Sequence, residues 1–129
     1  MYSPEWRVHE CEQLEGDVFR INLTGRMDLP GVDGIETELA QMTAAPRKAI
    51  VVDLSGVIFI TSFGIRTLLV HAKAIHCRRG NMVLLNPDAS VSYILETAGV
   101  NTVIPICRNL QAALSAVAEP WTSPDDRDL

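Results

Sequence analysis

The chain has 129 residues, of which 47% are hydrophobic and 21% charged, so we expect one globular domain with a single core. Its 16 acidic and 11 basic residues give a net charge of −5, which argues against a dedicated binder of nucleic acid or of anionic membranes. No apolar stretch approaches the ~18 residues that a membrane helix needs. The three cysteines follow no disulfide spacing, and no signal peptide precedes them, so we expect a cytoplasmic protein without direct membrane insertion.

The pattern of apolar residues predicts alternating strands and helices. Strands are predicted at residues 6–12, 18–24, 49–54, 82–85 and 103–106. Helices are predicted over residues 31–44, 62–79, 87–98 and 110–117. The order β-β-α-β-α-β-α-β-α predicts an α/β fold with a mixed sheet. We expect a single domain over residues 6–118, a disordered lead-in at 1–5 and a flexible tail at 119–129.

Short signals set the expected ends of these elements. A turn between the first two strands makes them a hairpin, and the run of residues 25–28 is expected to end the second strand. Asn86 and Asn109 are expected to cap the last two helices, and Gly99 to end the earlier of them. Pro105 interrupts the final strand, which favours an edge position because proline cannot donate to the ladder.

The chain is organised around residues 51–75, where an apolar run feeds the turn Thr61-Ser62-Phe63-Gly64 and helical spacing begins. The predicted core stripe of that helix comprises Ile65, Leu68, Leu69, Ala72 and Ile75. An uncharged stripe on the opposite side comprises Phe63, Thr67, Val70, Ala74 and Cys77. Arg66 and Lys73 flank this second stripe, and we interpret it as a docking surface. There are two alternatives to a docking surface. The apolar residues of this stripe are ordinary scattered surface residues, or the stripe is covered by a second layer of the fold or by the other subunit of a homodimer.

Ser62 lies where the strand ends and the helix starts, and three roles are open to it: helix cap, nucleophile or phosphorylation switch. A hydrolase elbow needs a small residue two positions earlier, where this chain has Ile60, and no histidine is placed as a late triad base. The nucleophile is therefore disfavoured. The cap and the switch are compatible, because a capping hydroxyl at an exposed helix start is also accessible to a kinase.

Metal and nucleotide sites have no support in the sequence. His71, His76 and Cys77 are poorly spaced to share one helix face, so we interpret the histidines as ordinary surface residues. The glycines in residues 31–34 lack the lysine of a phosphate-binding loop. We expect no cofactor, no metal and no enzymatic activity.

The residues of the central turn resemble a known family. The run DLSGVIFITSFGIRTLLV, residues 53–70, resembles the signature of STAS domains, specifically of bacterial anti-sigma factor antagonists. Residues 23–28 resemble the family's L-x-G-x-L-D sequence before its first helix, and residues 81–85 and 98–100 resemble its later strand and turn. The resemblance covers residues 6–118, nearly the whole chain.

The resemblance implies a STAS-like fold and a function in partner switching. It implies that Ser62, two residues before the motif glycine Gly64, is phosphorylated by an anti-sigma factor serine/threonine kinase and dephosphorylated by a phosphatase. The unphosphorylated protein would bind the anti-sigma factor and release a sigma factor, and phosphorylation would prevent this. Thr61 stands where many members have aspartate, and is a candidate second acceptor.

The expected partner-binding residues combine the docking stripe with the family motif. They are Asp28, which matches an acidic residue near the serine in the family, and Thr61, Ser62, Phe63, Gly64, Arg66, Thr67 and Val70. A second function is consistent with the same resemblance: a soluble STAS subunit of a membrane transporter, such as a lipid ABC system.

Overall fold

A computed structural model describes residues 7–13, 18–27, 49–78 and 80–118 of the chain. The helix predicted over residues 31–44 and both predicted terminal segments lie outside these residues, and so does Asp28. Within the described part, the alternation of strands and helices agrees with the predicted α/β fold.

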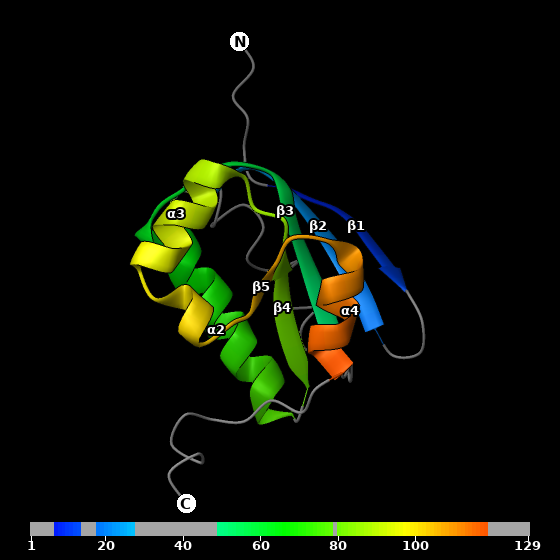
Figure 1. The fold of residues 1–129 in the computed structure, drawn as a ribbon. Helices are drawn as coiled ribbons and strands as arrows, with labels where there is room; N and C mark the ends of the chain where they lie inside the picture. Colours follow the sequence, from blue (N-terminus) through cyan, green and yellow to red (C-terminus); the bar gives the residue numbers. More distant parts are fainter. Residues whose placement is uncertain (1–6, 14–17, 28–48, 79, 119–129) are drawn as a thin grey trace, which may run out of the picture.

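The strands form one mixed sheet in the order β1-β2-β3-β4-β5 (Figure 1). They are β1 Arg7–Gln13, β2 Val18–Met27, β3 Ala49–Ile60, β4 Asn81–Leu85 and β5 Ile106–Cys107. β1 and β2 pair antiparallel, which confirms the predicted hairpin, and all later neighbours pair parallel. Parallel neighbours need crossover connections, and helices supply them between β3 and β4 and between β4 and β5.

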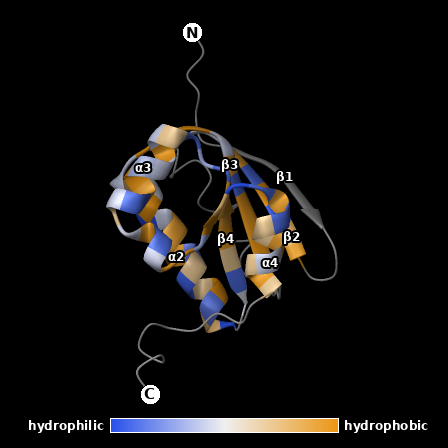
Figure 2. Cartoon of the chain, in the orientation of Figure 1, coloured by the Kyte–Doolittle hydropathy of each residue, from blue (hydrophilic) through white to orange (hydrophobic). Residues whose placement is uncertain are grey.

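Helices lie on both faces of this sheet (Figure 1). They are α2 Ser62–Cys77, α3 Ala89–Thr97, the short 3₁₀ helix η1 Val100–Thr102, and α4 Leu110–Ala118. α2 and α3 lie on one face and α4 on the other (Figure 1), and Figure 2 shows both hydrophobic and hydrophilic residues on each α-helix. Among the described residues, no helix has the length and apolarity needed to cross a bilayer.

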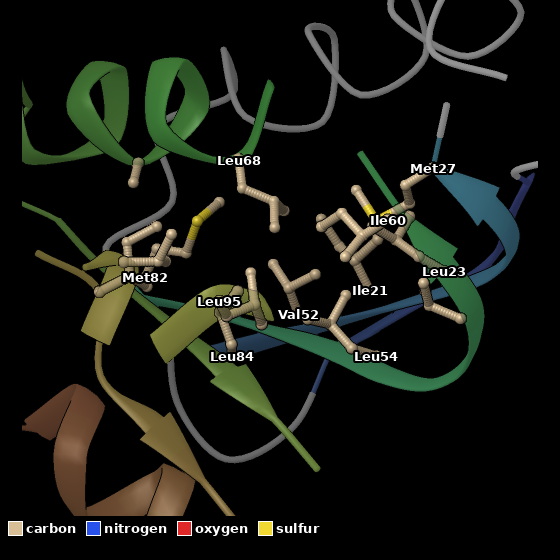
Figure 3. Packing of buried hydrophobic residues seen from close by; sticks show 14 of the residues in the cluster. Ile21, Leu23, Met27, Val52, Leu54, Ile60, Leu68, Met82, Leu84 and Leu95 are labelled. Atoms are coloured by element: carbon tan, nitrogen blue, oxygen red, sulfur yellow. The ribbon is translucent and has the colours of Figure 1, made fainter. Parts of the chain in front are cut away.

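The two faces of the sheet explain the run of β-branched residues in β3. Side chains alternate along a strand, so Ile50 and Val52 join the core beneath α2 and α3, whereas Val51 joins the smaller core beneath α4. Figure 3 shows the larger core, with Leu68 of α2 pointing toward Val52 of the sheet. The prediction of a strand buried on both faces is therefore confirmed for residues 49–54.

β2 and β3 continue together beyond the residues predicted for them. Residues 25–28 were expected to end β2, and β3 was expected to end at Leu54, but the two strands stay paired to Met27 and Ile60, through two register shifts. Gly56 permits this pairing, since a Cβ there would lie 2.6 Å from Thr24 Cγ2. Strand pairing thus outweighs the local turn signal, and it carries both strand ends to the start of α2.

The predicted Asn86 cap of α3 is wrong. The Asn86 N–H donates to the Cys107 carbonyl oxygen at 2.7 Å, which keeps this residue at the sheet, with a left-handed φ of 51°. Asp88 caps α3 instead, and its Oδ1 accepts from the Val91 N–H at 2.8 Å. This backbone hydrogen bond, together with one from the Ser90 hydroxyl, holds the pKa of Asp88 below its usual value.

The other residues predicted to begin or end an element are confirmed, and the last strand starts later in the chain than predicted. Gly99 ends α3 at a left-handed φ of 79°, and Asn109 Oδ1 accepts from the Ala112 N–H at 2.8 Å as the cap of α4. β5 occupies the predicted edge but covers Ile106–Cys107 rather than residues 103–106, because η1 and the turn after it occupy the preceding residues.

The interpretation of the α2 histidines as surface residues is wrong. His71 is buried against the core and His76 is partly buried. Burial disfavours the charged imidazolium and lowers the pKa of His76 to about 4. Within the described part of the chain, no cluster of three side chains is suited to bind a metal ion.

Candidate functional site

The turn between β3 and α2 is fixed by Thr61. Its backbone is extended, with φ −115° and ψ 179°, so Thr61 is the N-cap residue of α2. Its N–H donates to the Met27 carbonyl oxygen at 3.1 Å, and its hydroxyl donates to the same oxygen at 3.2 Å. These two bonds attach the start of α2 to the end of β2, and the Thr61 side chain makes no capping hydrogen bond.

Ser62 is the first residue of α2, and the interpretation of Ser62 as the cap is therefore wrong. A capping side chain belongs to the residue before the first helical one, and Thr61 holds that position. The Ser62 side chain is exposed, and among the described residues its hydroxyl takes part in no hydrogen bond. The Ser62 hydroxyl is thus open to solvent, on a turn whose backbone is bonded to the end of β2.

Gly64 allows α2 to start this close to the sheet. It is buried, and a Cβ at this position would lie 2.6 Å from the Met27 carbonyl oxygen, 2.7 Å from Met27 Cβ and 2.9 Å from Ile60 Cγ1. Figure 3 shows Met27 and Ile60 side by side at this end of the core. Any side chain at residue 64 would push the first turn of α2 away from both strands.

The close approach of Gly64 also determines the rotation of α2. Thr67 and His71, three and seven residues later, are on the same side of the helix and are buried. Thr67 was expected to face solvent, and that prediction is wrong; its hydroxyl is satisfied by donating to the Phe63 carbonyl oxygen at 3.0 Å. Ile65 and Leu69, predicted for the core, are only partly buried.

The opposite side of α2 is exposed over the whole length of the helix. We call it the α2 outer face, and it comprises Ser62, Phe63, Arg66, Val70, Lys73 and Cys77. Phe63 and Val70 leave 46% and 51% of their surface exposed, and both charged members, Arg66 and Lys73, are cations. Four of the predicted contact residues therefore lie together on one surface.

The end of β3 adds exposed apolar residues that the sequence analysis did not single out. Ile58 and Phe59 are 54% and 38% exposed, and they precede Ser62 by only a few residues. The Arg26 guanidinium of β2 stacks on the Phe59 ring, 4.4 Å from its centroid, a cation–π contact. Both apolar residues belong to a continuous apolar run, in which sequence alone does not distinguish buried from exposed positions.

A separate polar hollow of about 380 Å³ lies on the surface of β2 and β3. On its floor the buried Asp53 accepts from Arg20 Nη2 at 2.5 Å, and from the N–H of Ser55 at 2.9 Å. Burial alone would raise the pKa of Asp53, but the hydrogen bonds from Ser55 and Arg20 outweigh burial and lower it. The carboxylate is therefore charged at neutral pH and compensated within the fold, which indicates a structural role.

Comparisons with known proteins agree with the geometry of this fold. The family profile described as the STAS domain matches residues 11–113. BtrV of Bordetella bronchiseptica, provisionally assigned as an anti-sigma factor antagonist, is 28% identical over 94 residues, which cover 73% of this chain and 81% of BtrV.

Solved structures show the same fold. An anti-sigma factor antagonist from Mycobacterium paratuberculosis superposes with a TM-score of 0.76 at 23% identity, over 85% of this chain and 92% of that one. SpoIIAA of Bacillus, in its phosphorylated form, superposes with a TM-score of 0.63 at 18% identity, over 84% of this chain and 97% of that one. At these identities the likeness establishes the fold alone.

Proposed function

The chain belongs to the STAS domain family, and on that basis we propose that it is an anti-sigma factor antagonist controlled by phosphorylation. In this proposal the unphosphorylated protein binds an anti-sigma factor that is also a serine/threonine kinase, and so releases a sigma factor. Phosphorylation of Ser62 prevents binding, and a phosphatase restores it. The protein acts in the cytoplasm as a binding partner and carries out no reaction itself. The names of BtrV and of the Mycobacterium protein support the assignment as an antagonist, and the existence of a phosphorylated form of the Bacillus protein supports control by phosphorylation.

The observation that carries the proposal is the position of Ser62. An exposed hydroxyl without a hydrogen-bond partner among the described residues is accessible to a kinase active site. The two bonds from Thr61 to the Met27 carbonyl oxygen hold the turn in place, so a kinase meets a preformed backbone rather than a flexible loop. The exposed Phe63 beside the serine offers an apolar anchor for recognition.

The proposed contact residues divide by burial. Ser62, Phe63, Arg66 and Val70 belong to the α2 outer face and are proposed to touch the partner directly, together with the partly buried Thr61. Asp28 lies outside the described residues and is proposed as a contact from the family motif alone. Gly64 and Thr67 are buried, so we assign them the role of positioning α2.

The charge of the α2 outer face specifies the partner further. The chain as a whole carries a net charge of −5, yet the charged residues on this face are the cations Arg66 and Lys73. A surface with apolar residues and two cations fits a partner with an apolar pocket bordered by acidic residues.

Replacing Phe63 with serine is expected to weaken binding of the anti-sigma factor at least tenfold. An aromatic anchor buried in an interface commonly contributes ~2 kcal/mol or more, and ~1.4 kcal/mol corresponds to a factor of ten. Isothermal titration calorimetry with the kinase that binds the unmodified protein measures the change. Tyr93→Ser is the matched control, because Tyr93 is an aromatic residue on α3 that is 71% exposed and outside the α2 outer face. Equal losses for both variants would contradict the assigned surface.

A further inference from the structure

The spacing of Ser62 and Arg66 on α2 points to an ion pair that exists only after phosphorylation. We propose that Arg66 binds the phosphate of phosphorylated Ser62 within the same helix. This inference rests on the proposed function, since it requires a phosphate on Ser62. Arg66 would present its charge to the partner when Ser62 is unmodified, and this charge would be neutralised when Ser62 is phosphorylated.

The geometry of the helix brings the two side chains together. Residues four apart lie one above the other on a helix surface, with Cβ atoms ~5–6 Å apart. Helical side chains point back toward the N-terminus, so the long Arg66 side chain extends over the first turn, where Ser62 lies. Both residues are exposed. An anionic residue four positions before a cationic one is also the more favourable order of such a pair.

Arg66 has no competing anion on its own helix. The residues three and four positions away from it are Ser62, Phe63, Leu69 and Val70, and none is acidic. Among the described residues, the Arg66 guanidinium takes part in no hydrogen bond or ion pair. The phosphate would therefore be the first anion within its reach along α2.

Three other cations of the described part have another partner or are distant. Arg26, on the strand that meets the start of α2, stacks on Phe59, and Arg20 pairs with Asp53. Lys73 is eleven residues after Ser62, or ~16 Å along the helix axis, which exceeds the ~8–10 Å screening length at physiological salt. Arg66 is thus the cation that the fold places beside the phosphate.

The ion pair between Arg66 and the phosphate would change the charge of the surface that the partner contacts. Before phosphorylation the α2 outer face presents two positive charges, Arg66 and Lys73. A phosphate brings about −1.5 to −2 charges, so the net charge of the face falls to roughly zero. The guanidinium held by the phosphate can no longer pair with acidic groups of the partner. Phosphorylation would then remove an attraction as well as add bulk and negative charge.

The test installs phosphoserine at residue 62 during synthesis, by genetic code expansion, and titrates it by ³¹P NMR. Because a guanidinium nearby favours the dianion, the second pKa of the phosphate should be lower by about 0.15–0.4 unit with Arg66 than in the Arg66→Gln variant. Lys73→Gln is the matched control and should leave this pKa unchanged. The same pKa in all three proteins would overturn the proposal.

The outcome separates this inference from the proposed function. The phosphate is introduced without a kinase, so the titration reads the ion pair even if no kinase modifies Ser62. Conversely, a protein that is phosphorylated and released by its partner but shows no effect of Arg66 on the phosphate would retain the switch without this ion pair. Circular dichroism of each variant checks that α2 is intact.

Discussion

Replacing Ser62 with aspartate should weaken binding of the anti-sigma factor by a factor of ten to a thousand while leaving the stability of the fold nearly unchanged. The added carboxylate would meet a partner surface that we propose to be apolar and bordered by acidic residues, which costs several kcal/mol, and each ~1.4 kcal/mol is a tenfold loss of affinity. The cost arises in the complex only, because the Ser62 side chain is exposed in the free protein.

The stability of the Ser62→Asp variant is informative in its own right. Ser62 is not the cap of α2, so its replacement removes no capping bond, and a negative charge in the first turn is favoured by the helix dipole. We expect the free energy of unfolding in urea to change by less than ~0.5 kcal/mol. Ser62→Ala is the control and should bind like the unmodified protein. A Ser62→Asp protein that binds normally, or that loses several kcal/mol of stability, would contradict the assigned role.

Replacing Gly64 with alanine should destabilise the fold by ~1–3 kcal/mol, the largest effect we expect on stability. Alanine is normally favoured over glycine in a helix by about 1 kcal/mol, so the sign of the change is diagnostic. Here the new Cβ would meet the Met27 carbonyl oxygen at 2.6 Å and Met27 Cβ at 2.7 Å, and neither belongs to the far end of a flexible side chain. Either the first turn of α2 or the end of β2 must move.

Urea unfolding followed by circular dichroism measures this loss. Ser62→Ala lies two residues away on the exposed side of the same turn and serves as the control, with little expected change. Because Gly64 positions the α2 outer face, the alanine variant should also bind the anti-sigma factor more weakly. A Gly64→Ala protein as stable as the original, or more stable, would show that α2 does not depend on this close approach.

Local patterns in the sequence were sufficient to predict most elements. Period-two alternation identified the hairpin, and the β-branched run identified the start of β3 with burial on both faces. Gly99 and Asn109 were identified from backbone chemistry that acts within a few residues. Each of these features depends on residues only a few positions apart, so a single sequence is sufficient to predict them.

The features that were missed depend on contacts between distant residues. The rotation of α2 follows from Gly64 meeting Met27. The inward side of the helix therefore includes Thr67 and His71 in addition to three members of the predicted apolar stripe, Leu68, Ala72 and Ile75, which are buried as predicted. β3 continues to Ile60 because β2 continues beside it. Neither pairing nor close approach can be read from hydrophobic periodicity.

The candidate site was predicted in position but not in detail. The turn with Ser62 and the exposure of Phe63 and Val70 follow from the strand-to-helix junction and the helical wheel. The exposed Ile58 and Phe59 were missed, because all residues of the run that contains them are apolar and polarity therefore does not distinguish its buried side chains from its exposed ones. The stretch before Ser62 accordingly exposes more apolar residues than the sequence indicated.

The most direct test of the proposed switch at Ser62 is to locate the phosphate after reaction with an anti-sigma factor kinase that binds the protein. We expect mass spectrometry after incubation with ATP to find one phosphate, on Ser62, and the modified protein to leave the complex. Thr61 is the less favoured acceptor, because its hydroxyl donates to the Met27 carbonyl oxygen and its side chain is partly buried. A kinase that binds this protein yet places phosphate on neither Ser62 nor Thr61 would contradict the account.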